Sequence, residues 1–164
     1  AQALVVEMGG EPVHVAEADR ALYHAALAHA SNHLVTILAQ SQQMLASIGI
    51  EDPAHYMGPL VRAAVDNALA SGEGALTGPV ARGDAGTVAA HMRALGEYAQ
   101  GEKTGDITDS YAALAHATAK RAHNRGLLND EQLERIESLV EPSANVEYTG
   151  DTDDSAPENK EFSS

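Results

Sequence analysis

The sequence predicts an all-α fold, a bundle of five or six helices, and three observations lead to it. Apolar residues make up 44% of the chain, but Ala is the main contributor, and the aromatic residues are one Phe and five Tyr with no Trp. This composition favours closely packed helices over a β-sandwich. Apolar residues recur at helical spacing, and Gly, Pro and capping residues separate the stretches in which they do so. The 164 residues suffice for one domain with a core.

The first 16 residues have a different pattern from the rest of the chain. Residues 1–10 are predicted to be the end of a helix that Gly9 and Gly10 stop, and residues 11–15 a short strand. This strand has no predicted partner in the sequence. We therefore expect residues 1–16 to be a remnant of the end of a Rossmann-like domain. The alternative is an N-terminal arm that packs on the helices.

Residues 17–48 have the pattern of one long helix that ends at Gly49. Its apolar residues at near-helical spacing are Leu22, Leu27, Leu34, Ile37, Leu38, Met44, Leu45 and Ile48. The length and the many Ala residues favour a central helix of a bundle or of a dimer core. Five shorter helices would leave part of this apolar stripe uncovered, so we expect a homodimer built on the long helix.

Helix-capping residues divide the chain after Gly49 into separate helices. Asp52 and Pro53 predict the start of a helix, and Gly58-Pro59 is expected to break or kink it before it resumes over residues 60–71. The segment 72–74, Gly-Glu-Gly, ends it.

Three more helix starts follow. Asp84 is predicted to cap a helix that runs to about residue 99, after which a turn leads to a helix that Asp106 or Thr108 opens and that ends near Gly126. Asn129 is predicted to cap the last helix. The buried face of that helix is expected to carry Leu133, Ile136, Leu139 and Val140.

The chain is strongly acidic, with 24 acidic residues against 10 Lys and Arg and a net charge of −14. Residues 141–164 contribute −6 of this charge, so we expect a helical domain over residues 17–141 and a disordered acidic tail over residues 142–164. The acidity argues against nucleic acid as a partner, and no apolar run has membrane-spanning length. The absence of Cys excludes thiolate chemistry, and a cytoplasmic protein is expected.

Residues 75–91 carry the strongest functional signal. A loop of Gly and Pro bears Thr77, Arg82 and Asp84, and it runs into a helix that bears Thr87 and His91. Such loops place polar side chains and free backbone amides around a polar or anionic ligand. These five residues are therefore candidates for binding a small-molecule substrate.

Two other interpretations of this loop follow from its residues. Gly78 and Gly83 are spaced as in a phosphate-binding loop, but Asp84-Ala85 occupies the positions where Lys and Ser or Thr are required. Cradling of a nucleotide phosphate is thereby excluded. The remaining alternative is a plain connection between helices, in which Asp84 caps the second helix and Arg82 pairs with Asp84.

The long helix carries a second group of polar residues. His24 and Asn32 lie along one stripe of the helix, and a His is suited to proton transfer near neutral pH. In the alternative, Asn32 bonds across a helix interface and His24 caps a pocket. His29 and His33 have the spacing of a metal pair, but no third ligand can be named, and we expect no metal site. His116 and His123 are expected to be solvated charges.

Residues 75–95 resemble the Leu-Thr-Gly-Pro, Arg-Gly-Asp, Thr-Val and His pattern of a bacterial family in which a Rossmann-like domain precedes a helical domain of unknown function. The resemblance covers roughly residues 11–141. Members of this family are regarded as NAD(P)-dependent oxidoreductases, and their helical domain is similar to the C-terminal domains of the phosphogluconate-dehydrogenase-like superfamily. The resemblance implies the substrate-binding and dimerisation half of such an enzyme, with NADP or NAD held by a domain absent from this chain.

Within that superfamily, the pyrroline-5-carboxylate reductases place a Ser-Pro-Gly-Gly-Thr-Thr loop ahead of a helix, at the substrate and the nicotinamide. By this analogy Thr77 and Thr87 would donate hydroxyl hydrogen bonds near the reacting centre, and Arg82 would clamp a carboxylate. Phosphogluconate dehydrogenases use a Lys and an Asn one helical turn apart. Ala28 stands in place of that Lys here, so His24 would have to transfer the proton beside Asn32.

A second class of function stays open. The chain could be a non-catalytic helical module that dimerises or binds a protein partner. A strand, a GxGxxG turn and a helix encoded upstream of Ala1 would favour the enzyme, because the chain itself lacks this fingerprint.

Overall fold

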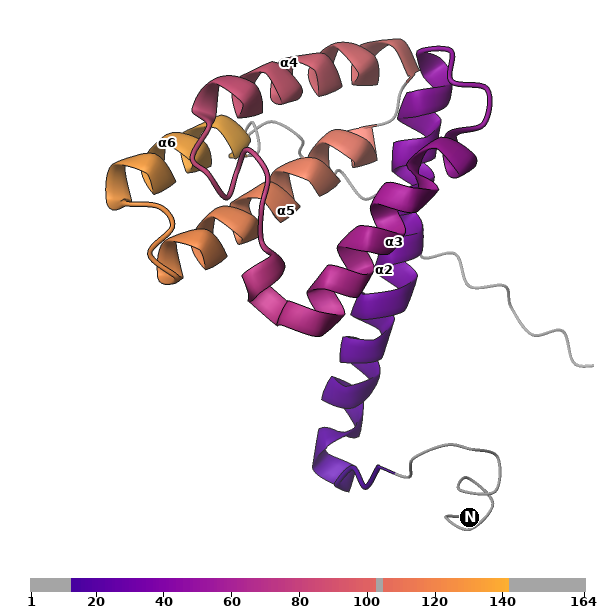
Figure 1. Ribbon diagram of the computed structural model, residues 1–164, viewed down its shortest axis with the longest axis vertical. Helices are drawn as coiled ribbons and strands as arrows, with labels where there is room; N and C mark the ends of the chain where they lie inside the picture. Colours follow the sequence, from indigo (N-terminus) through magenta and orange to yellow (C-terminus); the bar gives the residue numbers. More distant parts are fainter. Residues whose placement is uncertain (1–12, 103–104, 142–164) are drawn as a thin grey trace, which may run out of the picture.

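The computed structural model describes residues 13–102 and 105–141, and in these ranges every regular element is helical (Figure 1). The predicted all-α bundle is therefore confirmed. The elements in chain order are η1 (Glu17–Asp19), α2 (Arg20–Ser47), α3 (Pro53–Ser71), η2 (Gly72–Ala75), α4 (Ala85–Glu102), α5 (Gly105–Asn124) and α6 (Asp130–Val140), where η denotes a short 3-10 helix.

The helices form two unequal groups. α4, α5 and α6 pack against one another, and the loop between η2 and α4 joins their core. α2 and α3 form a hairpin at one side of this group, and the first half of α2 extends beyond the other helices (Figure 1). The side-chain amide of Gln40, the one buried residue of α2, donates hydrogen bonds to Asp106 Oδ2 at 2.9 Å and Ser110 Oγ at 3.0 Å. These bonds tie α2 to the first turn of α5.

The core lies between α4, α5 and α6. Small buried residues on α5 allow its two neighbours to approach closely. These residues are Ala112, Ala115, Ala119 and Ala122. Among the described residues the largest fully buried side chains are Ile136, Val88 and Val140. The predicted buried face of α6 is confirmed, since Leu133 and Leu139 pack against the same cluster.

Helices α3 and α6 begin at the predicted capping residues, Asp52 and Asn129. The Asp52 carboxylate accepts a hydrogen bond from the His55 N–H at 3.0 Å, and Pro53 is the first residue of α3. Asn129 and Gln132 form a reciprocal capping box at the start of α6, with distances of 2.9 and 3.0 Å.

Two predicted features are wrong. The expected break at Gly58-Pro59 is not found, since α3 continues through Pro59 as one helix and Pro59 lacks only its own N–H. The strand expected over residues 11–15 is not found in its described part, where residues 13–16 have no regular structure. The predicted helix over residues 1–10 and the acidic tail over residues 142–164 lie outside the described residues. None of the described helices has the length and apolarity to cross a membrane.

Candidate functional site

The loop from residue 76 to Asp84 is anchored to the core by apolar side chains and presents polar side chains to solvent. The N–H groups of Arg82, Gly83 and Asp84 donate to the carbonyls of Gly78, Val80 and Pro79 at 2.9–3.1 Å, which closes a compact turn. The side chains of Val80 and Ala81 are buried in the core, whereas those of Thr77, Arg82 and Asp84 are exposed. The packing of the apolar residues therefore holds the polar ones at the surface.

Asp84 caps α4 as predicted. Its carboxylate accepts from the Thr87 hydroxyl at 2.7 Å and from the Thr87 N–H at 3.0 Å. The hydroxyl bond and then the N–H bond hold the pKa of Asp84 below its usual value, and the charges of Arg82 and His91 act in the same direction. Because the folded-state pKa is lowered, this stabilisation is present above the usual Asp pKa of 3.8 and is lost as the pH falls through the folded-state value.

His91 has a partner that the sequence analysis missed. Its Nδ1 lies 2.8 Å from the hydroxyl of Tyr111 on α5, and the two rings meet edge to face with centroids 5.8 Å apart. Burial raises the pKa of the half-buried Tyr111 hydroxyl, which therefore keeps its proton near neutral pH. Tyr111 lies four residues after the buried Ile107 and four residues before the buried Ala115 on α5. Its helical spacing from these two apolar residues is the signal that could have identified it.

Arg82 is free of the ion pair that the alternative interpretation requires. In the described part of the chain, no carboxylate lies within 4.0 Å of its guanidinium, and Asp84 bonds to Thr87 instead. The exposed guanidinium is thus available to a ligand at the start of the polar row Asp84, Thr87 and His91.

An apolar groove of about 470 Å³ lies on the other side of Thr77. One flank of α3, with Leu60, Ala64 and Asn67, forms one wall of this groove, and the chain from Gly72 to Thr77 forms the other. η2 is fastened in place by Glu73, whose carboxylate pairs with Arg121 and whose carbonyl accepts from Arg125.

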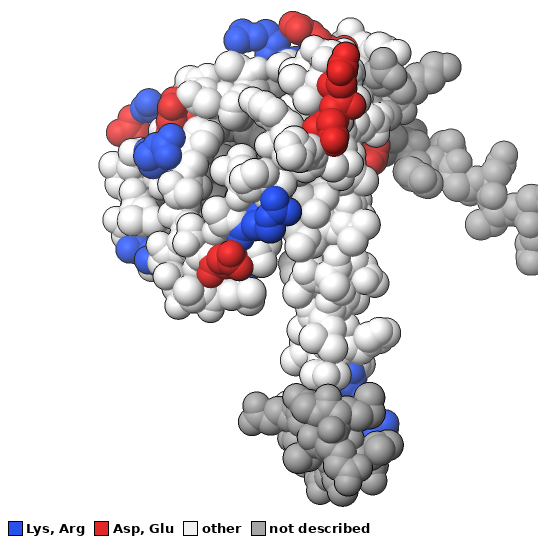
Figure 2. All heavy atoms as spheres, turned by 45° about the vertical axis from the view of Figure 1, so that its right-hand side comes forward, with Lys and Arg blue, Asp and Glu red and all other residues white. Residues whose placement is uncertain are grey.

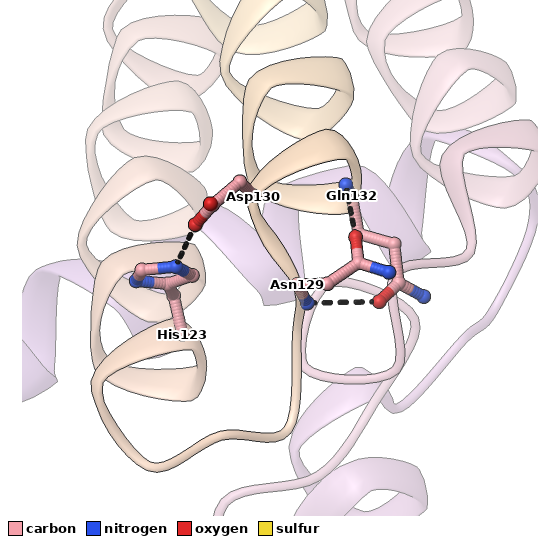
Figure 3. A network of polar contacts seen from close by, with 4 residues as sticks. All are labelled: His123, Asn129, Asp130 and Gln132. Carbon is pink, nitrogen blue, oxygen red and sulfur yellow. Dashed lines mark hydrogen bonds and ion pairs between the residues drawn. The ribbon is translucent and has the colours of Figure 1, made fainter.

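His116 and His123 on α5 each lie close to a carboxylate of α6. His123 Nε2 lies 2.7 Å from Asp130 Oδ1, beside the Asn129–Gln132 capping box (Figure 3). His116 Nδ1 lies 3.5 Å from Glu137 Oε1. Both side chains keep part of their surface in solvent, 41% for His116 and 32% for His123, and α6 brings a carboxylate near each of them, which the sequence did not predict.

The candidates on α2 are not brought to the loop within one chain. His24 and Asn32 lie on the exposed first half of α2, and among the described residues Asn32 Oδ1 accepts one hydrogen bond, from the adjacent Ser31 Oγ at 3.1 Å. The alternative of a bond from Asn32 across a helix interface is not found. His29 Nδ1 and His33 Nδ1 are 2.9 Å apart, and the described residues contain no cluster of three or more potential metal ligands.

The fold and the loop define a helical domain with a polar surface at the start of α4. The model of the domain of unknown function DUF2520 matches residues 1–118, which include α2, α3, α4 and most of α5. The chain belongs to this family. No curated protein and no solved structure was found to match it.

Proposed function

We propose that this chain is the helical substrate-binding and dimerisation half of an NAD(P)-dependent oxidoreductase. The observation that carries the substrate role is the polar surface from Arg82 through Asp84 and Thr87 to His91 and Tyr111. A free guanidinium, a hydroxyl and a His–Tyr pair lie in sequence along one side of α4 there. The resemblance of residues 75–95 to a Rossmann-containing family supplies the reaction class.

The described residues do not form a dinucleotide cradle. A Rossmann cradle needs a strand, a glycine-rich turn and a helix, and the described ranges hold no strand. NADP or NAD would therefore bind to another domain, and the residues of this chain would only hold and orient the substrate. Arg82 is suited to a carboxylate or phosphate, because a guanidinium forms two parallel hydrogen bonds with either group. The Tyr111 hydroxyl, protonated near neutral pH, could donate a hydrogen bond beside that anion.

The substrate role of Arg82 can be tested without knowing the reaction. In the whole gene product, a panel of small carboxylates and phosphorylated compounds should include members that raise the melting temperature, because a ligand that binds only the folded state stabilises it. Arg82→Lys should abolish this shift while leaving the melting temperature of the free protein nearly unchanged. Arg93→Lys, at the next cation along the chain, is the matched control and should keep the shift.

A loss of stability with unchanged ligand shifts would contradict the ligand role of Arg82. If Arg82 were a structural partner of Asp84, Arg82→Lys would lower the melting temperature of the free protein by several degrees and leave the ligand shifts intact.

A non-catalytic dimerisation or interaction module is the second candidate. One observation favours it, namely that α2 and α3 expose many large apolar side chains. Both candidate functions are compatible with a homodimer, but only the oxidoreductase half requires a ligand at the surface from Arg82 to Tyr111. The thermal-shift experiment with Arg82→Lys therefore distinguishes them.

A further inference from the structure

The apolar groove on α3 and η2 lies outside the polar row that begins at Arg82. Its volume of about 470 Å³ falls within the range of small-molecule sites, roughly 300–1,000 Å³. Leu and Ala side chains, among them Leu60 and Ala64, form most of its lining. Glu73 is the one charged residue of the lining, and its carboxylate is paired with Arg121. The groove therefore fits an uncharged, apolar group.

The groove and Arg82 meet at the same loop. Thr77 is part of the groove lining, and the carbonyl of the next residue, Gly78, accepts the N–H of Arg82 at 3.1 Å. This bond holds the backbone of Arg82 beside the residue that follows Thr77. A Cβ atom at Gly78 would meet nothing within 4 Å, so the space next to Gly78 is open. One extended small molecule can therefore reach from the groove to Arg82.

A single exposed cation is by itself a weak site for an anion, because water and salt screen an ion pair at the surface. On the face that Figure 2 shows, the Lys and Arg side chains are scattered and do not form one basic patch. The chain as a whole carries a net charge of −14, which repels anions. A ligand held by Arg82 therefore needs a second source of affinity, and burial of apolar surface in the adjoining groove supplies it.

We propose that the substrate is an amphiphilic anion, whose carboxylate or phosphate binds the guanidinium of Arg82 while its apolar part lies in the groove between α3 and η2. This substrate class rests on the proposed ligand role of Arg82. It excludes a small molecule that is polar at both ends, because a second polar group would lose its hydration in the groove without gaining a partner.

Three series of probes test this class of substrate in the whole gene product. They are butanoate, hexanoate and octanoate, then the butyl, hexyl and octyl phosphates, and finally the uncharged alcohols of the same lengths. Thermal-shift titrations give the Kd of each probe. In at least one anion series, the Kd should fall by about fourfold for each added CH2 until the groove is filled. Each anion of that series should bind more tightly than the alcohol of its length, and the tighter series identifies the anion.

Two variants separate the two parts of the site. Ala64→Leu places a larger side chain on the exposed groove wall and should remove the dependence of the Kd on chain length. Arg82→Gln removes the charge and should make each anion bind no better than the matching alcohol. Ala113→Leu, at an exposed Ala of α5, is the matched control for Ala64→Leu and should behave as the parent. Circular dichroism checks that each variant keeps its helical content.

Several results would overturn the proposed substrate class. Equal affinity for all chain lengths would leave the anion role of Arg82 intact but would exclude an apolar part in the groove. A chain-length dependence that persists in Ala64→Leu would place the apolar part elsewhere, and alcohols that bind as tightly as anions would separate the groove from Arg82. If no probe binds, the class is wrong, and the Arg82→Lys panel still decides the proposed function. The two failures are therefore distinguishable.

Discussion

Ile136→Ala should lower the free energy of unfolding by about 2–5 kcal/mol, the range found when a buried large aliphatic side chain is truncated. Ile136 is fully buried in α6, at the centre of a core otherwise rich in Ala. Few bulky side chains fill this core, so each of them contributes a large share of its apolar burial. Urea unfolding followed by circular dichroism measures the effect.

Leu114→Ala is the control for this truncation, because Leu114 lies on the outer side of α5 with 43% of its surface exposed. It should change the free energy of unfolding by about 0.5 kcal/mol or less. Similar losses for the two variants would show that the core does not lie between α4, α5 and α6.

Gly83→Ala should destabilise the chain by about 2 kcal/mol, which combines the cost of a left-handed backbone for Ala with damage to a helix cap. The φ angle of Gly83 is +68°, and a Cβ atom there would lie 2.8 Å from Gln132 Nε2 and 3.1 Å from Leu128 Cδ2. Gln132 closes the capping box of α6, so the added methyl group would displace a residue that starts the helix. Thermal unfolding of the variant measures the loss.

Gly96→Ala is the matched substitution within α4. A Cβ atom at Gly96 would meet nothing within 4 Å, and Ala is favoured over Gly inside a helix. This variant should be more stable than the parent by about 0.5–1 kcal/mol. Equal stabilities for the Gly83 and Gly96 variants would contradict the contact between the loop and the cap of α6.

The sequence predicts the fold well because helix ends depend on neighbouring residues. Asp52, Asp84 and Asn129 all cap the helices that they were expected to cap, since a cap needs only a side chain and an N–H two or three positions later. The effect of Pro59 was predicted wrongly because it does not depend on neighbouring residues alone. A Pro inside a helix costs one hydrogen bond, and whether the rest of α3 tolerates this loss is not a local matter.

The candidate site was only partly predictable. Asp84, Thr87 and His91 come together because they lie within two turns of one helix. The bonds from Gln40 to α5, from His91 to Tyr111 and from Glu73 to Arg121 join residues 20–70 positions apart, and only the packing of the helices brings them together. Periodicity located the apolar stripe of α2 and indicated that part of it would stay uncovered, but it did not indicate that Leu22 and Leu27 belong to the uncovered part of the described chain.

The central claim is that this chain binds the substrate while another domain binds the dinucleotide. Calorimetric titration of NADPH and NAD into this chain and into the whole gene product tests it most directly. We expect saturable micromolar binding of one dinucleotide to the whole gene product and no such binding to this chain. Saturable micromolar binding to this chain alone, or no binding to the whole gene product, would contradict it.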